Sequence, residues 1–416
     1  MLALAPTTWA CYGIPLGVFL SVAIFLRYAY RRAGSESEKW DSLGGRRWRC
    51  ERKGDGVGEL RERVTRERVW LPGSKRLPQK PSNAQKLGDL GIPVLKDTAD
   101  ILRWLGVDLK SLLPLANPER RVRPGKSNYV EWTVKKRRAG LRVICSPKPR
   151  LKAIQRKIKA EILDRAPVHM AAHGFVRTRS IATNAAGHVG RKLVVNLDLR
   201  NFFEHIRIQQ VYGVFRHLGY GSEVSRWLAR LCTHAPQLGE ASRGLDGQWE
   251  MQRIRRHAVQ GAPTSPALAN LACLRLDRRL TGLAKKFDAE YTRYADDLTF
   301  SGDERFKRGM KRFLDHLHMI IRLEGFSENY VKRRFMRSGQ RQQVTGVVVN
   351  QRVNVARDEY DRLKAIIHNA RKTGLDAQNR DHRPDFRAYL LGRAAHVAQL
   401  NPERGRKLVE AIRAVS

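Results

Sequence analysis

Cysteine is scarce in this 416-residue chain, and its few copies are not arranged for metal binding. No Cys-x-x-Cys pair occurs, and no histidine stands near a cysteine at the spacing of a zinc site. The sequence therefore predicts no zinc centre, and scattered cysteines favour a reducing cytosol. The five cysteines are Cys11, Cys50, Cys145, Cys232 and Cys273.

Acidic residues are also few relative to basic ones. The chain has 40 Asp and Glu against 80 Lys and Arg, a formal net charge of +40. Such a surplus would repel itself unless a polyanion neutralised it, and Lys and Arg that replace counterions on phosphates bind nucleic acid. An arginine-rich genome is the alternative explanation. Hydrophobic residues make up 42% of the chain, enough to form folded domains and exclude a wholly disordered protein.

Charge is absent from the first 26 residues, and three arginines follow by residue 32. This pattern predicts a transmembrane anchor over residues 1–32 with its basic flank in the cytoplasm, because a span needs about 20 apolar residues. Translation from a downstream start is the alternative, and a secretory signal peptide is disfavoured because no basic segment precedes the apolar run. Residues 33–82 are rich in Gly, Arg, Glu and Ser and predict a basic linker. In each case the rest of the chain would face the cytoplasm.

The remainder of the chain mixes helical and strand patterns without regular alternation or internal repeats, which predicts an α+β fold. The expected helices are Lys152–Leu163, Val211–Leu231, Ala267–Phe287 and most of the chain after Ala356. The expected strands are Val130–Val134 with Leu141–Ile144 as a hairpin, Lys192–Asp198, two strands within Ala289–Ser301, and Gln343–Asn350. A polar loop or ribbon is expected over His234–His257.

Two adjacent aspartates, Asp296 and Asp297, give the sharpest chemical signal. Apolar residues on both sides predict a tight turn between strands, and two carboxylates held about 4 Å apart repel by roughly 4 kcal/mol. A divalent cation would remove that repulsion, and Asp198, which ends a buried-type strand, could supply a third oxygen ligand. Oxygen ligands without Cys or His select Mg²⁺ or Mn²⁺. The alternative is a solvated turn, with Asp198 as a helix cap.

Three acids on paired strands of a basic protein fit two-metal phosphoryl transfer. The segments around them resemble reverse transcriptases. Asp198–Phe203 resembles polymerase motif A, Gln260–Pro266 motif B, and Tyr294–Asp297 motif C, while Asn329 and Lys332 fit the motif that places a lysine near the triphosphate. In motif B, a serine (Ser265) is expected to cap the following helix.

Further segments resemble bacterial retron reverse transcriptases, over roughly Ala84 to the C-terminus. They are Leu141–Arg156, His173–Phe175, Arg179–Ile181, Asn184–His188, Gln343–Gly346 and Asn401–Gly405. The resemblance implies a right-hand polymerase, with fingers and an antiparallel palm over residues 83–340 and a helical thumb over residues 341–416.

The resemblance also implies partners. A structured noncoding RNA would serve as template and as primer through a 2′-hydroxyl, dNTPs would be polymerised with two Mg²⁺ ions, and the branched RNA–DNA product would act in phage defence. A separate effector protein and a membrane contact through the N-terminus are expected as well. The alternatives are a group II intron or diversity-generating reverse transcriptase, or a ribonucleoprotein scaffold or antitoxin that restrains an effector.

Residue roles follow from the motif positions. Asp198, Asp296 and Asp297 would hold the metal ions, and Lys332 would protonate pyrophosphate, unless it forms a plain phosphate-binding patch with Arg333 and Arg334. Gln260 and Gly261 are expected beside the nucleotide. Phe203 is expected as a steric gate, with a core phenylalanine as the alternative. Arg142 is expected on the triphosphate, with a plain surface arginine as the alternative.

Four residues are candidates for RNA binding. Asn184 and His188 would recognise RNA structure or, alternatively, brace motif A. Thr345 and Gly346 would help read an RNA stem, with a strand-end turn as the alternative.

Overall fold

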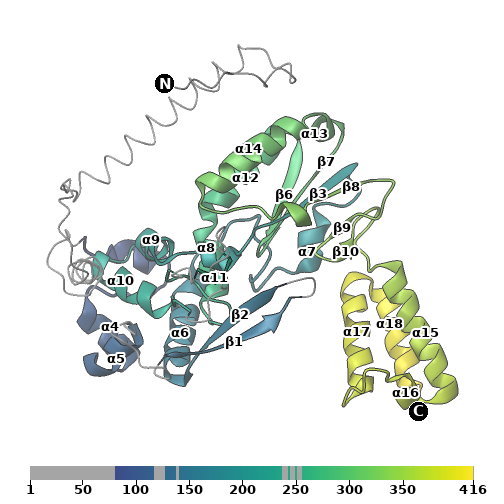
Figure 1. Cartoon of the computed structure of the whole chain (residues 1–416), viewed down its shortest axis with the longest axis horizontal. Coiled ribbons are helices and arrows are strands. Elements are labelled where there is room, and N and C mark those ends of the chain that lie inside the picture. Colours follow the sequence, from purple (N-terminus) through teal and green to yellow (C-terminus); the bar gives the residue numbers. More distant parts are fainter. Residues whose placement is uncertain are drawn as a thin grey trace, which may run out of the picture. The chain divides into compact units, whose positions relative to one another are not determined.

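The computed structural model describes residues 80–116, 127–136, 140–236, 242–243, 249–250 and 255–415 (Figure 1). The expected anchor over residues 1–32 and nearly all of the expected linker over residues 33–82 lie outside this part. Within the described residues, every helix is too short or too polar to cross a bilayer.

A four-stranded antiparallel sheet forms the centre of the fold, in the order β6-β7-β3-β8 (Figure 1). The middle strand β3 reads Leu-Val-Val-Asn-Leu-Asp and is almost continuously buried, as expected for a strand covered on both faces. With helices packed around the sheet, the predicted α+β class is confirmed. The strands are β3 (Leu193–Asp198), β6 (Ala289–Tyr294), β7 (Asp297–Gly302) and β8 (Arg334–Arg337).

Two helices, α12 (Leu274–Lys286) and α14 (Met310–Leu323), pack against each other and cover the part of the sheet that includes β6. On α14, Phe313, Leu317 and Ile321 are buried at the four-residue spacing of one helix face. The ring of Phe313 lies 5.0 Å from that of Phe300 on β7, edge to face. Burial of each such side chain contributes about 1.5–3 kcal/mol. The short helix α13 (Glu304–Arg308) joins β7 to α14.

A second antiparallel pair, β1 (Tyr129–Lys135) and β2 (Leu141–Pro147), forms the predicted hairpin. The backbone N–H of Cys145 donates to the carbonyl of Gln260 at 2.7 Å, so β2 is tied to the loop before α11. One hydrophobic core joins the sheet to the elements around this hairpin. They include α3 (Ala84–Asp89), α4 (Thr98–Leu105), α5 (Leu109–Ala116), α6 (Pro149–Glu161), η1 (Leu163–Arg165), α8 (Phe202–His205), α9 (Ile208–Leu218), α10 (Ser222–Leu231) and α11 (Ser265–Ala272).

A separate core forms around the C-terminal helices, which the sequence predicted to follow Ala356. It also takes in Val194 of β3, Met336 of β8 and the short hairpin of β9 (Gln343–Val344) and β10 (Val347–Val348). Gly405 lets two of these helices approach closely, because a Cβ there would lie 2.2 Å from the Cα of Ala398. The elements are α7 (Ile181–Ala186), α15 (Arg357–Thr373), α16 (Leu375–Gln378), α17 (Phe386–Leu400) and α18 (Pro402–Arg413).

Several predicted elements are wrong in detail. The predicted helix Val211–Leu231 is two helices, because Gly219 adopts a left-handed φ of 117° and ends α9. The predicted helix Ala267–Phe287 is also divided, at Cys273. Apolar spacing continues across both breaks, so periodicity did not reveal them.

Two further corrections concern single positions. The strand predicted over Gln343–Asn350 is a hairpin that turns at Thr345 and Gly346. Ser265 does not cap α11; Thr264 holds the cap position, and it makes no side-chain capping bond. The polar segment 234–257 contains a short ribbon of β4 (Ser242–Arg243) and β5 (Trp249–Glu250), in line with its prediction.

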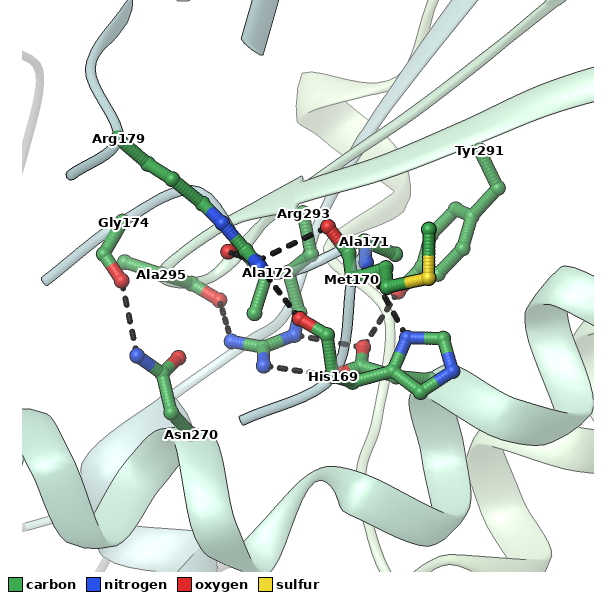
Figure 2. Close-up of polar contacts among 11 residues, drawn as sticks. His169, Met170, Ala171, Ala172, Gly174, Arg179, Asn270, Tyr291, Arg293 and Ala295 are labelled. Carbon is green, nitrogen blue, oxygen red and sulfur yellow. Dashed lines mark hydrogen bonds and ion pairs between the residues drawn. The ribbon is translucent and has the colours of Figure 1, made fainter. Parts of the chain in front are cut away.

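A buried ion pair joins helix α12 to strand β6. The side chains of Asp277 and Arg293 are both 0% exposed, and the guanidinium donates through Nε at 2.8 Å and through Nη2 at 2.7 Å. Tyr291 adds its hydroxyl to Asp277 at 2.9 Å. The remaining nitrogen of Arg293 donates to the carbonyl of Ala295 at 3.1 Å, where the chain turns from β6 into β7 (Figure 2). Burial alone would lower the pKa of Arg293, but the charge of Asp277 outweighs it and raises the pKa.

The segment 169–174 adds to the free edge of β6. Arg293 and Ala172 form a parallel bridge, with Arg293 N donating to Ala171 O and His173 N donating to Arg293 O, each at 2.7 Å. Arg179 donates to the carbonyls of residues 169, 170 and 172, and so fixes the shape of the segment (Figure 2). The ion pair, the turn and this segment therefore form one connected unit.

The close approach at Gly405 generates a first prediction. Gly405→Ala should lower the free energy of unfolding by about 3 kcal/mol or more, because the new methyl group collides with backbone that cannot move aside. The control is Gly392→Ala in the exposed middle of α17, where a Cβ meets nothing within 4 Å and the unfolding free energy should rise by about 0.5–1 kcal/mol. Urea unfolding of the full chain measures both. Equal effects would contradict the close packing.

The buried ion pair generates a second prediction. Asp277→Asn should lower the free energy of unfolding by about 3–5 kcal/mol, because it leaves the guanidinium of Arg293 buried without a counter-charge. Tyr291→Phe is the matched control, since it removes one hydrogen bond to the same carboxylate and should cost about 1 kcal/mol. Thermal unfolding followed by near-UV circular dichroism separates the two. A loss in Asp277→Asn no larger than in the control would mean that the pair does not stabilise the sheet.

Candidate active site

Three aspartates from distant parts of the sequence meet at one end of the central sheet. Asp198 is the last residue of β3, and Asp297 is the first of β7. The antiparallel register of the two strands places them opposite each other. Asp296 occupies the turn before β7, where its carbonyl accepts a bond of 2.9 Å from the N–H of Leu199. The structure thus brings together the three carboxylates that the sequence singled out.

The turn that carries two of these aspartates is tight. Tyr294 pairs with Asp297, so only Ala295 and Asp296 connect β6 to β7. Ala295 has a φ of 57°, a left-handed conformation that costs a residue with a Cβ roughly 1–2 kcal/mol. The hydrogen bond from buried Arg293 to the Ala295 carbonyl helps to hold this conformation.

The carboxylates repel one another. The pKa of Asp296 is raised by burial and then by the charge of Asp198. The pKa of Asp297 is raised to about 7, again first by loss of solvent and then by the charges of Asp296 and Asp198. Because Asp297 is exposed, repulsion by the two neighbouring carboxylates contributes more to this rise than burial does. Lys332, Arg142 and Arg334 oppose the rise, which places three basic groups around the acids.

Asp198 is held by the segment that follows α14. Lys332 Nζ lies 2.8 Å from Asp198 Oδ1, and Asn329 Nδ2 donates to Oδ2 at 3.2 Å. Asn329 also donates its backbone N–H to the Asp198 carbonyl at 2.8 Å. The short helix η2 (Tyr330–Lys332) carries the lysine, whose side chain is 49% exposed. Lys332 thus lies beside the aspartates, and its expected role near the triphosphate stays a prediction.

A buried acid, Glu328, also holds this segment in place. Glu328 has a side chain 1% exposed, and both its oxygens accept from Arg333, at 2.6 and 2.8 Å. His318 on α14 lies 2.9 Å from the same carboxylate. Arg333 is therefore a structural residue rather than part of an open phosphate-binding patch, whereas Arg334 is exposed and near Asp297.

The donor set at this end of the sheet fits a hard divalent cation. It consists of carboxylate oxygens whose mutual repulsion a cation would relieve. In the part of the chain that the structure describes, no group of three or more His, Cys, Asp or Glu side chains is already arranged to hold a metal. Asp198 instead engages Lys332 and Asn329. The residues could hold metal ions once Asp198 exchanges those partners.

The expected nucleotide contacts come from three elements, namely α8, the loop before α11, and β2. Phe203 on α8 is half-buried, with its ring 5.4 Å from that of buried Phe202. Gly261 has a φ of 106°, and a Cβ there would lie 2.8 Å from the carbonyl of Cys145, so this position requires glycine. Gln260 beside it is half-buried, and Arg142 on β2 is exposed with its charge felt at Asp296.

The four candidate RNA-binding residues divide into two pairs. Asn184 and His188 are both 0% exposed. His188 bridges the hydroxyls of Ser301 at 2.6 Å and Thr292 at 2.7 Å, and burial lowers its pKa to about 3, so the ring is neutral. These contacts attach His188 to β6 and β7, the strands on either side of the Asp296–Asp297 turn, rather than to motif A as the alternative expected.

The other pair forms the β9–β10 turn. Thr345 and Gly346 have φ angles of 48° and 86°, the two left-handed residues that a type I′ hairpin turn needs. Thr345 is half-buried and lies 3.4 Å from the amide of Asn184, while Gly346 is exposed. Their backbone is thus the turn that the alternative predicted. Both residues also keep exposed surface that an RNA stem could contact.

Sequence reasoning missed the residues that support the site. Arg293 and Asp277 were not singled out, because the strand Ala289–Tyr294 also carries Glu290 and Thr292, so its arginine did not stand out. Glu328 and Asn270 were also missed. Asn270 donates to the carbonyl of Gly174 at 2.9 Å, and no sequence pattern indicates that contact.

Comparison with known proteins agrees with this geometry. The family model described as reverse transcriptase (RNA-dependent DNA polymerase) matches residues 134–355. The chain is 42% identical over 331 residues to the Retron Mx65 reverse transcriptase of Myxococcus xanthus, covering 79% of this chain and 74% of the relative. It is 32% identical over 289 residues to the Retron Ec86 reverse transcriptase of Escherichia coli, covering 69% and 82%.

Among solved structures, the chain is similar to telomerase from Candida albicans in complex with a fragment of telomeric RNA. The TM-score is 0.37 at 10% identity, over 67% of this chain and 54% of that one, a similarity too low to add to the assignment. The family match and the identities to curated relatives are sufficient without it. The chain belongs to the bacterial retron reverse transcriptases, which are RNA-directed DNA polymerases with a right-hand fold.

Proposed function

We propose that this reverse transcriptase copies a structured noncoding RNA by extending a 2′-hydroxyl of that RNA, which yields branched RNA–DNA used in phage defence. The observation that carries the polymerase chemistry is the register of β3 with β7, which sets Asp198 opposite Asp297. Membership of the retron family supports the branched product and its role.

Asp198, Asp296 and Asp297 are the proposed ligands of two Mg²⁺ ions, with Mn²⁺ as a substitute. Bound there, such ions would activate the attacking hydroxyl and neutralise charge on the leaving pyrophosphate. The repulsion that raises the pKa of both turn aspartates supports this assignment, because it disappears when cations bind.

Basic groups around the acids have separate tasks. Lys332 orients Asp198, and it could donate a proton to pyrophosphate once it leaves that carboxylate. Arg142 and Arg334 are exposed close to the aspartates and would contact phosphate oxygens of the triphosphate or primer. Gln260 and Gly261 would lie beside the incoming nucleotide, with Phe203 excluding a ribose 2′-hydroxyl.

The RNA and dNTPs are the proposed partners, in line with the net charge of +40. We assign fingers and palm to residues 83–340 and thumb to residues 341–416. The second hydrophobic core supports a helical thumb, although it also includes Ala185, Val194 and Met336 from the residues assigned to the palm. The exposed Gly346 turn next to that core is available to an RNA stem.

Asp297→Asn tests the catalytic assignment. The full chain, purified with the RNA encoded beside its gene, should add labelled dNTPs to that RNA in Mg²⁺, and the DNA should stay attached to RNA. Asp297→Asn should reduce synthesis by at least about 100-fold, because it removes a direct metal ligand. Asp315→Asn, an exposed aspartate on α14, is the matched control and should retain synthesis. Full activity in Asp297→Asn would refute the metal assignment.

Metal removal is a separate prediction on the wild-type complex. Chelation by EDTA should abolish DNA synthesis while the RNA remains bound, and added Mg²⁺ or Mn²⁺ should restore it. Gel electrophoresis of labelled product gives the activity, and filter binding gives the RNA. If the DNA starts only from the 3′ end of an added primer, an intron or diversity-generating type of enzyme would be favoured instead.

A further inference from the structure

Phe175 combines two features that are unusual for a phenylalanine. Its side chain is 49% exposed, so the ring is not part of the hydrophobic core. Its φ is 62°, in the left-handed region that bulky residues rarely adopt. A glycine or asparagine would fit the turn with less strain, and strain of this kind is found most often at functional sites. The needs of the fold therefore do not explain why residue 175 is a phenylalanine.

The backbone before Phe175 is fixed against the catalytic turn. A Cβ on Gly174 would lie 2.7 Å from the N of Ala295 and 3.3 Å from the Cα of Tyr294, so the two backbones are in direct contact. Asn270 donates to the carbonyl of Gly174 at 2.9 Å (Figure 2). The preceding residue, His173, donates its N–H to the carbonyl of Arg293 on β6 at 2.7 Å. The backbone that carries Phe175 is thus held rigidly beside the turn of Asp296 and Asp297.

The ring of Phe175 meets the ring of Phe203. Their centroids are 6.5 Å apart and the planes are tilted by 45°, within the range of an aromatic pair. On another side, Phe203 contacts Phe202, which is 4% exposed and stacked on Phe326 at 5.7 Å. Phe203 therefore lies between a ring fixed in the core and a ring fixed by the turn.

We propose that Phe175 is a positioning residue that holds the ring of Phe203 where a ribose 2′-hydroxyl would lie, and so sets the preference for deoxynucleotides. The proposal rests on the proposed polymerase function and on Phe203 as its steric gate. Phe203 is only half-buried, so without a second wall its ring can turn about χ1 and open space for the hydroxyl. The strained backbone at residue 175 places the ring of Phe175 against the ring of Phe203.

The test measures kcat/KM for a dNTP and the matching rNTP on the full chain bound to its RNA. In Phe175→Ala, the ratio of kcat/KM for the dNTP to kcat/KM for the rNTP should fall by about tenfold, because the loosened ring of Phe203 admits the 2′-hydroxyl. Phe175→Tyr keeps a ring at the same place and should keep the wild-type ratio. Met170→Ala, an 83% exposed side chain in the same segment, is the matched control and should also leave the ratio unchanged.

Two further variants separate positioning from a purely structural role. Phe175→Gly relieves the left-handed backbone, so its Tm should equal or exceed that of the wild type while its ratio falls as in Phe175→Ala. In a Phe203→Ala background, Phe175→Ala should lower the ratio no further, because the ring that it positions is already gone.

The outcomes are distinct. If wild type makes DNA but Phe175→Ala and Phe175→Gly keep the wild-type ratio, the inference is wrong and the polymerase proposal stands. A further fall of the ratio in the Phe203→Ala background would also overturn it, because Phe175 would then act on the sugar directly. If the wild-type complex makes no DNA, both proposals fail.

Discussion

The buried ion pair between Asp277 and Arg293 is the interaction on which the active-site geometry depends. It joins the helix behind the sheet to the strand that leads into the catalytic turn, and no water reaches it. Once Asp277 occupies two nitrogens of the guanidinium, the third can only point at Ala295, whose left-handed backbone sets the direction of the next two residues. A single charged contact thereby links the packing of α12 to the placement of two carboxylates.

The site is built as a balance of charges around that turn. Burial and neighbouring carboxylates raise the pKa of Asp296 and of Asp297, and three basic side chains reduce the effect without cancelling it. Lys332 lies in direct contact with Asp198 and acts as an internal counter-ion. The ion pair of Glu328 with Arg333 holds the segment that supplies this lysine. The position of the internal counter-ion therefore depends on Glu328, a second buried acid besides Asp277.

The sequence predicted the order and type of most elements and the meeting of the three aspartates, since apolar runs next to acids define strand ends locally. It did not predict the breaks at Gly219 and Cys273, because helical spacing of apolar residues continues across both. The hairpin at Thr345 and Gly346 was taken for one strand, because β-branched residues stand on both sides of Gly346. Arg293 could not be assigned from sequence, because its burial depends on an aspartate 16 residues away on another element.

The segment 169–174 has a consequence for the solution behaviour of the sheet. Strand β6 would otherwise end the sheet with unpaired backbone groups, which are templates for joining a second molecule edge to edge. The parallel bridge at Ala172 occupies part of that edge. The opposite edge, β8, is only four residues long and carries Arg334 and Arg337, whose charges repel another strand. Both edges are thereby protected against self-association, one by added backbone and the other by charge.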